Sequence, residues 1–399
     1  MAPSTTFCTI LARNYLPRAL SLADSVHRHH PGTPLVVLLI DVLRDEDLPE
    51  VPELPGVRLV STAALGLPER EVLDLAAIYD LVEFATAIKP VLFTRLLDET
   101  DQVVYLDPDT YITSPMVELT LALAASEGGI VLTPHYLERL PESAHASEGH
   151  LLTVGVYNLG FCAMDQRSRP MLDWWWGHLK VECLHNILSG LFVDQKWMDI
   201  GSTLFSAGTL RHYGYNVGVV NLHERPIDVD DEGYVIRSTG DRLRLFHFHA
   251  FDTSKPEELS TRSDAPTAHL RRENAALDIL CKEYAEDMLR HEQELPPAPD
   301  YPYWTDTTGR RIARQTRRVF RQQLQDGATP PSPYLPEEAK AYASWRRSAR
   351  KQVARDFVGD VAKAARCVAP DEIKRVKQRF PRLAGRVKDR YVDDSGIWG

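Results

Sequence analysis

Alternation of short apolar runs with longer amphipathic stretches constrains the fold of this 399-residue chain more than any other feature. The stretches 16–30 and 78–98 repeat apolar residues every three to four positions, as helices do. Strands separated by helices in this way are typical of an α/β protein with a mostly parallel central sheet flanked by helices. The expected strands lie at 5–11, 35–40, 57–61, 102–106, 129–133 and 158–164.

Residues that follow the strands of such a sheet carry functional information, because ligands bind outside the carboxyl ends of parallel strands. Arg13 and Tyr15 follow the first expected strand, and Asp41 follows the second. Asp107 and Asp109 follow the fourth. We therefore expect a ligand site at the edge of the sheet where these side chains meet.

The composition fits a globular protein of one large or two ordinary domains, since 44 % of the residues are hydrophobic. The longest uninterrupted apolar run, 35–40, is too short to span a bilayer, and the N-terminal sequence does not resemble a secretion signal. The five cysteines are scattered and have no C-x-x-C spacing, which predicts neither a disulfide framework nor a thiolate metal site. We therefore expect a cytoplasmic protein.

Charge is divided unevenly along the chain. Residues 301–399 hold 22 Lys and Arg against 11 Asp and Glu, whereas residues 1–300 hold 24 against 45, so a basic tail follows an acidic body. Within the tail, the sequence from Pro336 predicts a helix whose apolar stripe includes Trp345 and Phe357. The stripe either packs on the rest of the chain or contacts an anionic membrane surface. No nucleic-acid-binding module accompanies the basic residues, so we do not expect a nucleic-acid partner.

The segment VVYLDPDTYI, residues 103–112, places two carboxylates one residue apart at the end of the fourth expected strand. Asp107 and Asp109 can share Mg²⁺ or Mn²⁺, ions that commonly bridge a protein to a diphosphate. An Asp-Pro-Asp turn that ends the strand explains the same residues about as well. A phosphatase of the haloacid-dehalogenase type is disfavoured, because Thr110 directly follows the second aspartate and Tyr111 stands where that class has threonine.

Seven segments carry a resemblance to a known family; in chain order they are FCTILARNYLPRALSLADSV, TAIKPVLFTRLL, VVYLDPDTYI, YNLGF, FVDQKWMD, GYNVGVVNLHER and FHFHAFD. They resemble the GT-A fold nucleotide-sugar glycosyltransferases, especially the galactosyltransferase/glycogenin-like retaining group (glycosyltransferase family 8-like) and its uncharacterised bacterial relatives. The resemblance covers residues 5 to about 260. It implies a Rossmann-like GT-A catalytic domain at 1–260, followed by a helical, basic C-terminal extension at 261–399.

The resemblance also implies a metal site that joins distant segments. In the family the aspartate pair, here Asp107 and Asp109, binds Mn²⁺ or Mg²⁺ on the donor diphosphate, and a histidine of an H-x-x-G motif is the third ligand. The sequence HFHA aligns His247 with that histidine but has Ala250 in place of the glycine. His249 is a second candidate, because a lysine follows it at the interval seen in some members. Residues two apart on a strand share a face, so we expect both histidines at the site, and the choice between them stays open.

Three further residues have a role implied by the resemblance and a structural alternative. Tyr15 and Asp41 would border the base and ribose of the donor, or else serve as a helix-entry aromatic and a helix N-cap. Lys89 would meet the diphosphate as a point charge, or else be a solvated helix residue.

The segments YNLGF and FVDQKWMD supply the implied sugar pocket. Asp194 would hold sugar hydroxyls, Gln195 would face the anomeric carbon, and Asn158 would contribute to the same pocket. Helix capping or loop tying is the structural alternative for all three. In a retaining enzyme of this group no strong nucleophile is required, and the metal neutralises charge on the departing nucleoside diphosphate.

Together these implications predict a metal-dependent hexosyltransferase, as in polysaccharide biosynthesis, with UDP as the expected nucleotide of its sugar donor. The acceptor would be a glycan, a lipid-linked molecule or a small molecule, and transfer would proceed with retention. The basic helix would give peripheral contact with the inner face of the membrane. A non-catalytic nucleotide-sugar-binding or scaffold protein with the same fold is the alternative. Pocket shape, rather than sequence pattern, decides the sugar and the base.

Overall fold

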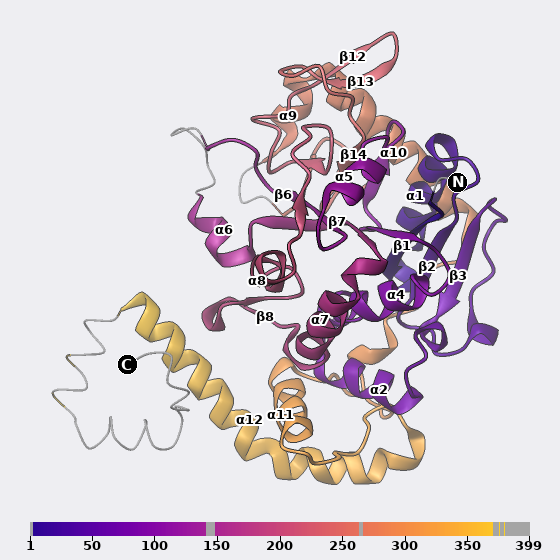
Figure 1. Ribbon diagram of the computed structural model, residues 1–399. Helices are drawn as coiled ribbons and strands as arrows, with labels where there is room; N and C mark the ends of the chain where they lie inside the picture. The colour runs from indigo at the N-terminus through magenta and orange to yellow at the C-terminus, as the bar shows by residue number, and fades with distance from the viewer. Residues whose placement is uncertain (1–2, 141–147, 263–265, 370–374, 376–378, 380–399) are drawn as a thin grey trace. The chain divides into compact units, whose positions relative to one another are not determined.

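Two compact units make up the chain in the computed structural model (Figure 1). Unit 1 comprises Met1–Val72 and Leu81–Pro302, and unit 2 comprises Leu73–Asp80 and Tyr303–Gly399. The residues that the structure describes are 3–140, 148–262, 266–369, 375 and 379.

Unit 1 is built on a seven-stranded sheet of order β10-β6-β7-β4-β1-β2-β3. All of its strand pairs are parallel except those of β7, which runs antiparallel to both β4 and β6. The predicted α/β class with a mostly parallel central sheet is confirmed, and each of the six expected strands is present to within one residue at either end. The strands are β1 (Thr5–Leu11), β2 (Leu35–Leu39), β3 (Val57–Ser61), β4 (Gln102–Leu106), β6 (Ile130–Pro134), β7 (Tyr157–Asp165) and β10 (Gly208–Thr209).

Helices flank this sheet, as predicted. The expected helix at 16–30 is α1 (Leu16–His29), and its apolar face, with Leu20 fully buried, joins a core cluster shared with the sheet. The expected helical stretch 78–98 contains two helices, because Pro90 lies in the first turn of α4 and cannot continue the hydrogen bonding of α3. The other helices of this part are α3 (Leu81–Ala87), α4 (Lys89–Leu96), α5 (Leu119–Ala125), α6 (Gly149–Val154), α7 (Arg169–Glu182) and α8 (Trp197–Leu204).

A smaller three-stranded sheet, of order β11-β14-β5, lies over a second core cluster. It consists of β5 (Thr110–Ile112), β11 (Val217–Gly218) and β14 (Leu245–His247). Helices α9 (Ala268–Glu273) and α10 (Ala275–Glu294) pack in that cluster, where the rings of Phe248 and Tyr284 stack with centroids 3.9 Å apart. Helix α10 also lies beside α1 (Figure 1). Residues 268–294 thus belong to the unit that contains the sheet, and the predicted division at residue 260 stays a prediction about domains.

Short elements complete unit 1. Two hairpins are formed by β8 (His185–Asn186) with β9 (Leu191–Phe192) and by β12 (Ile227–Asp230) with β13 (Gly233–Ile236). The 3₁₀ turns are η1 (Arg13–Tyr15), η2 (Asp45–Asp47), η3 (Thr62–Leu65), η4 (Gln166–Ser168) and η5 (Ile187–Ser189).

Unit 2 combines the C-terminal part of α2 (Glu69–Ile78) with the helices of the tail. The guanidinium of Arg317 donates to the carbonyls of Ala76 and Tyr79 and so satisfies the buried C-terminal end of α2. The predicted tail helix is confirmed as α12, and its Trp345 packs against Phe320 of α11. The elements of the tail are η6 (Pro302–Trp304), α11 (Arg314–Gln325), η7 (Pro336–Glu338) and α12 (Ala339–Val368).

Two general expectations concern membranes and cysteines. Within the described ranges, no helix has both the length and the apolar character needed to cross a membrane. Cys8, Cys162, Cys183 and Cys281 are buried and unbridged, while the side chain of Cys367 lies outside those described. The basic residues beyond 369 also lie outside the described ranges, except for residues 375 and 379.

Candidate metal centre

The Asp-Pro-Asp segment forms a closed turn at the carboxyl end of β4. The backbone N–H of Asp107 donates to the carbonyl of Gly160 (2.9 Å), which ties the turn to β7. The N–H and the hydroxyl of Thr110 both donate to the carbonyl of Asp107, at 3.1 and 2.8 Å. The turn is therefore made with backbone and hydroxyl groups, and the carboxylates of Asp107 and Asp109 are left for other partners.

Strand pairing brings a histidine to this turn. Strand β5 begins at Thr110 and pairs antiparallel with β14, which places His247 opposite Thr110. Nε2 of His247 lies 3.1 Å from Oδ1 of Asp109 and 3.8 Å from Oδ2 of Asp107. The two segments that the family resemblance joined in a metal site thus meet through one pair of short strands.

Asp109, His247 and His249 form a group that can hold a metal ion. Each offers one ligand atom, and these atoms lie within 4.8 Å of one another. Adjacent ligands of an octahedral ion at about 2.1 Å lie about 3 Å apart, which matches the separation of Asp109 and His247. Asp107 lies beside the group, next to His247. Mixed carboxylate and imidazole ligands suit Mn²⁺ better than Mg²⁺, which prefers oxygen.

The electrostatics of this group favour a cation among its members. Burial acts against ionisation of Asp109, yet His247 outweighs burial and holds the pKa of the Asp109 carboxyl well below its usual value. Burial also opposes protonation of His247, but the Asp109 carboxylate raises the pKa of His247 above its usual value. A positive charge between the carboxylate and the imidazole, either a proton or a metal ion, stabilises both.

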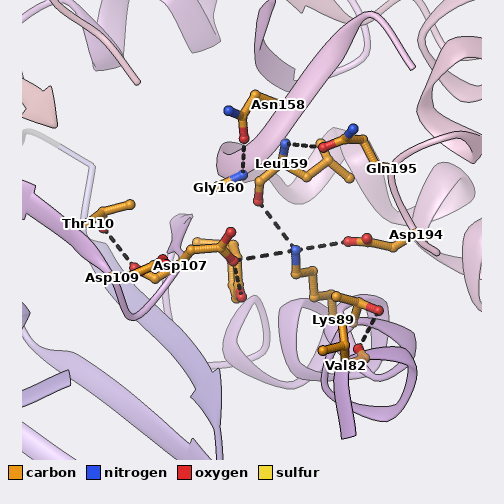
Figure 2. Close-up of polar contacts among 12 residues, drawn as sticks. Val82, Lys89, Asp107, Asp109, Thr110, Asn158, Leu159, Gly160, Asp194 and Gln195 are labelled. Atoms are coloured by element: carbon orange, nitrogen blue, oxygen red, sulfur yellow. Dashed lines mark hydrogen bonds and ion pairs between the residues drawn. The ribbon is translucent and has the colours of Figure 1, made fainter. Parts of the chain in front are cut away.

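A buried ion pair lies next to Asp107 (Figure 2). Nζ of Lys89 is 2.8 Å from Oδ2 of Asp194, and both side chains are almost fully buried. The same ammonium donates to the carbonyl of Leu159 (3.3 Å) and lies 4.1 Å from the centroid of the Tyr105 ring. Burial alone would lower the pKa of Lys89, but Asp194 and Asp107 outweigh burial and raise it. The alternative of a solvated helix lysine is therefore wrong, while contact of Lys89 with a diphosphate stays a prediction.

Asp107 connects the ion pair to the metal group. Its Oδ1 accepts from the Tyr105 hydroxyl (2.7 Å) and lies 3.8 Å from Nζ of Lys89, while its Oδ2 faces His247. The side chain of Asp107 is 29 % exposed, against 15 % for Asp109. Asp107 is therefore the aspartate of this pair that an incoming ligand reaches more easily.

Gln195 and Asn158 hold the backbone around the site through their amides (Figure 2). Oε1 of Gln195 accepts from the N–H of Leu159 (3.3 Å), and its Nε2 donates to the carbonyl of Val154 (2.9 Å). Oδ1 of Asn158 accepts from the N–H of Gly160 (3.0 Å). The structural alternative for both residues, the tying of loops, is thus observed, and their contacts with a sugar stay predictions.

Asp41 positions the turn that carries Tyr15. The N–H of Arg13 lies 3.1 and 3.3 Å from the two carboxylate oxygens of Asp41, and Nε of Arg13 donates to Oδ2 (3.0 Å). The half-buried Tyr15 ends η1, and its ring centroid is 4.4 Å from the guanidinium carbon of Arg18. Asp41 holds this turn rather than capping a helix, and contact of either residue with a nucleoside stays a prediction.

Three non-glycine residues beside the site have a left-handed backbone: Val193 (φ 41°), Asn216 (φ 53°) and Ala250 (φ 54°). Val193 directly precedes Asp194, and Ala250 stands where the resembling family has glycine. A left-handed conformation costs non-glycine residues about 1–2 kcal/mol, less for asparagine. The fold therefore holds backbone strain next to the candidate site, where such strain is common.

Two residues of the site were not expected from the sequence. Oδ1 of the buried Asn216 lies 3.1 Å from Nδ1 of His247. Gly160 leaves room for that imidazole, because a Cβ at this position would lie 2.5 Å from Nδ1 and closer still to Cε1. Both residues belong to segments that carry the family resemblance, but neither segment by itself indicates which distant histidine its residues contact.

Comparisons with known proteins found similar chains. No family model matches. The "Uncharacterized protein YfnF" of Bacillus subtilis (strain 168) is 25 % identical over 311 residues, which cover 74 % of this chain and 96 % of that protein. A glycosyltransferase involved in the glycosylation of the major capsid of PBCV-1 matches with 9 % identity and a TM-score of 0.35, over 72 % of this chain and 98 % of its own. The galactosyltransferase LgtC, in complex with donor and acceptor sugar analogs, matches with 14 % identity and a TM-score of 0.38. The match covers 74 % of this chain and 98 % of the LgtC chain.

Proposed function

We propose that this protein is a metal-dependent GT-A glycosyltransferase that transfers a hexose-type sugar from a UDP-sugar, or a related nucleotide sugar, with retention. The observation that carries the proposal is the convergence of Asp109, His247 and His249 at the end of β4, with the buried Lys89–Asp194 pair next to Asp107. Transfer from a nucleoside diphosphate needs charge stabilisation at the diphosphate and a polar group that orients the sugar. These two clusters supply both, and the order of the seven resembling segments supports the same assignment.

The metal group would hold Mn²⁺ or Mg²⁺ through Asp109, His247 and His249, with Asp107 at its exposed side. When bound, the ion would neutralise charge on the departing nucleoside diphosphate. The pairing of β5 with β14 holds His247 beside Asp109, so these two groups would need little rearrangement to hold the ion.

The sugar pocket would be formed around Asp194 and Gln195. Lys89 fixes one oxygen of the Asp194 carboxylate, so the other oxygen would accept from a sugar hydroxyl. Gln195 holds the backbone at Leu159 and Val154 and would form the wall that faces the anomeric carbon. Asn158 orders the same wall from β7.

The nucleoside would lie against η1, at the carboxyl ends of β1 and β2. Tyr15 offers a half-buried aromatic ring there, and Asp41 keeps that turn in place through Arg13. Arg18, whose guanidinium donates to the carbonyl of Phe251, adds positive charge close to the metal group. An aromatic ring beside basic groups suits a base that is joined to phosphates.

The test is hydrolysis or transfer of nucleotide sugars, measured across a panel of donors with and without Mn²⁺. We expect activity that needs the ion and that falls at least about 100-fold in Asp109→Ala, since a ligand of the metal is lost. Asp98→Ala, which removes an exposed carboxylate paired with Arg169 on the surface, is the matched control and should keep full activity. Unchanged activity of Asp109→Ala would overturn the metal role.

A non-catalytic nucleotide-sugar-binding protein is the competing function, and the same panel separates the two. Thermal shift measurements with Mn²⁺ report binding of each donor, because a ligand that binds only the folded state raises its stability. Binding of a nucleoside diphosphate without turnover of any donor and acceptor pair would favour the non-catalytic alternative.

Contact of α12 with a membrane belongs to the same proposal, since it would bring a lipid-linked acceptor within reach. The first half of α12 packs on α11, whereas Phe357 and Val361 in its second half are 54 % and 52 % exposed beside basic residues. Cosedimentation with anionic vesicles should therefore occur in the wild type and be lost in Phe357→Glu/Val361→Glu. Equal binding of the wild type to neutral vesicles would contradict the electrostatic part of this proposal.

A further inference from the structure

Asn216 occupies a position at which every polar atom of its side chain has a partner. The residue is buried, with 1 % exposure, and its backbone is left-handed. Its Nδ2 donates to Oγ1 of Thr133 (3.0 Å) and to the carbonyl of Asn158 (2.9 Å). Its Oδ1 lies 3.1 Å from Nδ1 of His247.

These partners fix the orientation of the amide. The carbonyl of Asn158 can only accept a hydrogen bond, so the amide nitrogen of Asn216, and not its oxygen, must face that carbonyl. The amide oxygen then faces His247, and since it can only accept, Nδ1 of His247 must carry the hydrogen. The network therefore selects the Nδ1–H tautomer when the imidazole is neutral.

This tautomer leaves the lone pair of Nε2 directed at the metal group. Nε2 is the nitrogen that lies 3.1 Å from Asp109 and 3.8 Å from Asp107. His249 is held differently, because Nη1 of Arg262 donates to its Nε2 at 2.8 Å and so uses the lone pair of that nitrogen. Among the described residues no donor uses Nε2 of His247, and this nitrogen faces the two aspartates, whereas Nε2 of His249 accepts from Arg262.

We infer that Asn216 is a positioning residue of the metal centre, and that it fixes His247 so that this ligand binds a divalent cation through Nε2. The inference rests on the proposed metal-dependent function. A partner on the second nitrogen of a metal-binding histidine sets its tautomer and ring orientation, and its loss commonly costs 10–100-fold in metal affinity. Gly160 leaves room at the same edge of the ring, where a Cβ would clash with Nδ1 and Cε1 and displace the imidazole.

The residue type fits both demands of this position. Asparagine tolerates a left-handed backbone better than other residues with a side chain, and its amide donates at one end while it accepts at the other. The backbone carbonyl of Asn216 also accepts from Nδ2 of Asn221 (3.1 Å), and this hydrogen bond helps to hold the backbone of Asn216 in place. Glycine would keep the backbone and remove the amide, and aspartate would keep the acceptor and remove the donors.

The experiment compares Asn216→Gly and Asn216→Asp with the wild type in the full chain, using Mn²⁺ alone as the probe. Free Mn²⁺ is measured by electron paramagnetic resonance during titration, and the tautomer of His247 is measured without metal by ¹H–¹⁵N spectra of ¹⁵N-histidine protein, above the titration of that histidine. His247→Gln assigns the resonance. We expect Asn216→Gly to bind Mn²⁺ about 10–100-fold more weakly and to lose the Nδ1–H signature. Asn216→Asp should keep the Nδ1–H signature, because its carboxylate still accepts from Nδ1.

Asn274→Ala is the matched control, because it removes the amide that caps α10 and leaves His247 untouched. It should lower the thermal stability of the protein without changing Mn²⁺ affinity. An Nε2–H tautomer in the wild type, or equal Mn²⁺ affinity of Asn216→Gly and the wild type, would overturn the inference alone. A wild type that binds no Mn²⁺ would instead overturn the proposed metal site, and with it the choice of His247 as ligand.

Discussion

Gly160 shows how one hydrogen atom in place of a side chain shapes the candidate site. Its backbone conformation is ordinary, so the need for glycine comes from the closeness of the His247 imidazole and not from φ. In Gly160→Ala the ring must leave its position beside Asn216 and Asp109, and we expect Mn²⁺ affinity and donor turnover to fall about tenfold or more. Titration with Mn²⁺ checks this result.

Gly177→Ala supplies the control for Gly160→Ala. A Cβ at Gly177, within α7, would meet no atom within 4 Å, so the substitution should stabilise the helix by about 0.5–1 kcal/mol and leave Mn²⁺ affinity unchanged. If both alanine variants bound Mn²⁺ as the wild type does, the imidazole would not need the space beside Gly160.

The Lys89–Asp194 pair gives a second prediction for single residues. Lys89→Met leaves the Asp194 carboxylate buried without its cation, which should lower the free energy of unfolding by about 3–5 kcal/mol. Lys89→Met/Asp194→Leu removes both charges and should recover most of that loss while staying inactive. Urea unfolding of the single and double variants measures both effects.

A surface pair of the same length is the control for that experiment. Nη2 of Arg169 lies 2.8 Å from Oδ1 of Asp98, but Asp98 is exposed and Arg169 only partly buried, so Arg169→Met should cost less than about 1 kcal/mol. Equal losses in Lys89→Met and Arg169→Met would mean that burial does not set the strength of the Lys89–Asp194 interaction.

Some of these site residues could be predicted from the sequence and others could not, and the difference has a physical reason. Asp107 and Asp109 could be found because their spacing and their position after an apolar strand are local properties. The burial of Lys89 could not, because the residues that enclose it come from β4, β7 and the segment at Asp194. Asn216 was missed for the same reason, since its three partners lie at residues 133, 158 and 247.

At the level of elements, periodicity located the strands of the large sheet but not the pairing that builds the site. The pairing of β5 with β14 involves only three residues on each strand, and strands this short carry little pattern. The family resemblance, with its seven segments in order, connected the aspartates to the histidines, which the periodicity of the sequence did not. The split of 78–98 into α3 and α4 could have been read from Pro90, which stops the preceding helix.

Arg317 links two elements of unit 2 and yields a prediction at this level. Its buried guanidinium donates to Ala76 and Tyr79 at the end of α2 and to the carbonyl of Tyr303. Arg317→Met leaves these buried carbonyls without their donor, so the free energy of unfolding, measured by thermal unfolding, should fall by about 3 kcal/mol or more. Arg347→Met, at an exposed position of α12, should change stability by less than about 0.5 kcal/mol. Similar losses in the two variants would contradict a capping role for Arg317.

For the whole molecule, the uneven charge indicated a basic tail after an acidic body but not where the main core ends. Tertiary contacts decide that point. Leu277, Leu280, Tyr284 and Met288 of α10 are fully buried in the cluster that also contains Phe246 and Phe248, on either side of His247. A helix far along the chain therefore supports the strand that carries the candidate metal ligand.

Chains of different length test this dependence. Burying the four α10 side chains contributes about 1.5–3 kcal/mol each, which together approaches the whole net stability of a typical domain. We therefore expect a chain that ends at residue 260 to show no cooperative urea transition and no Mn²⁺ binding. A chain that ends at residue 302 keeps α10, so it should unfold cooperatively and bind Mn²⁺.

The chain that ends at residue 302 lacks Arg317 and Tyr334, which in the full chain donate to the carbonyl of Ala76 within unit 2. Its unfolding midpoint should therefore lie below that of the full chain, because the end of α2 is left without its donors. Circular dichroism during urea unfolding compares the three lengths directly. Equal midpoints for the chains that end at residues 260 and 302 would show that α10 is not needed to support β14, and the metal centre would then depend on the first 260 residues alone.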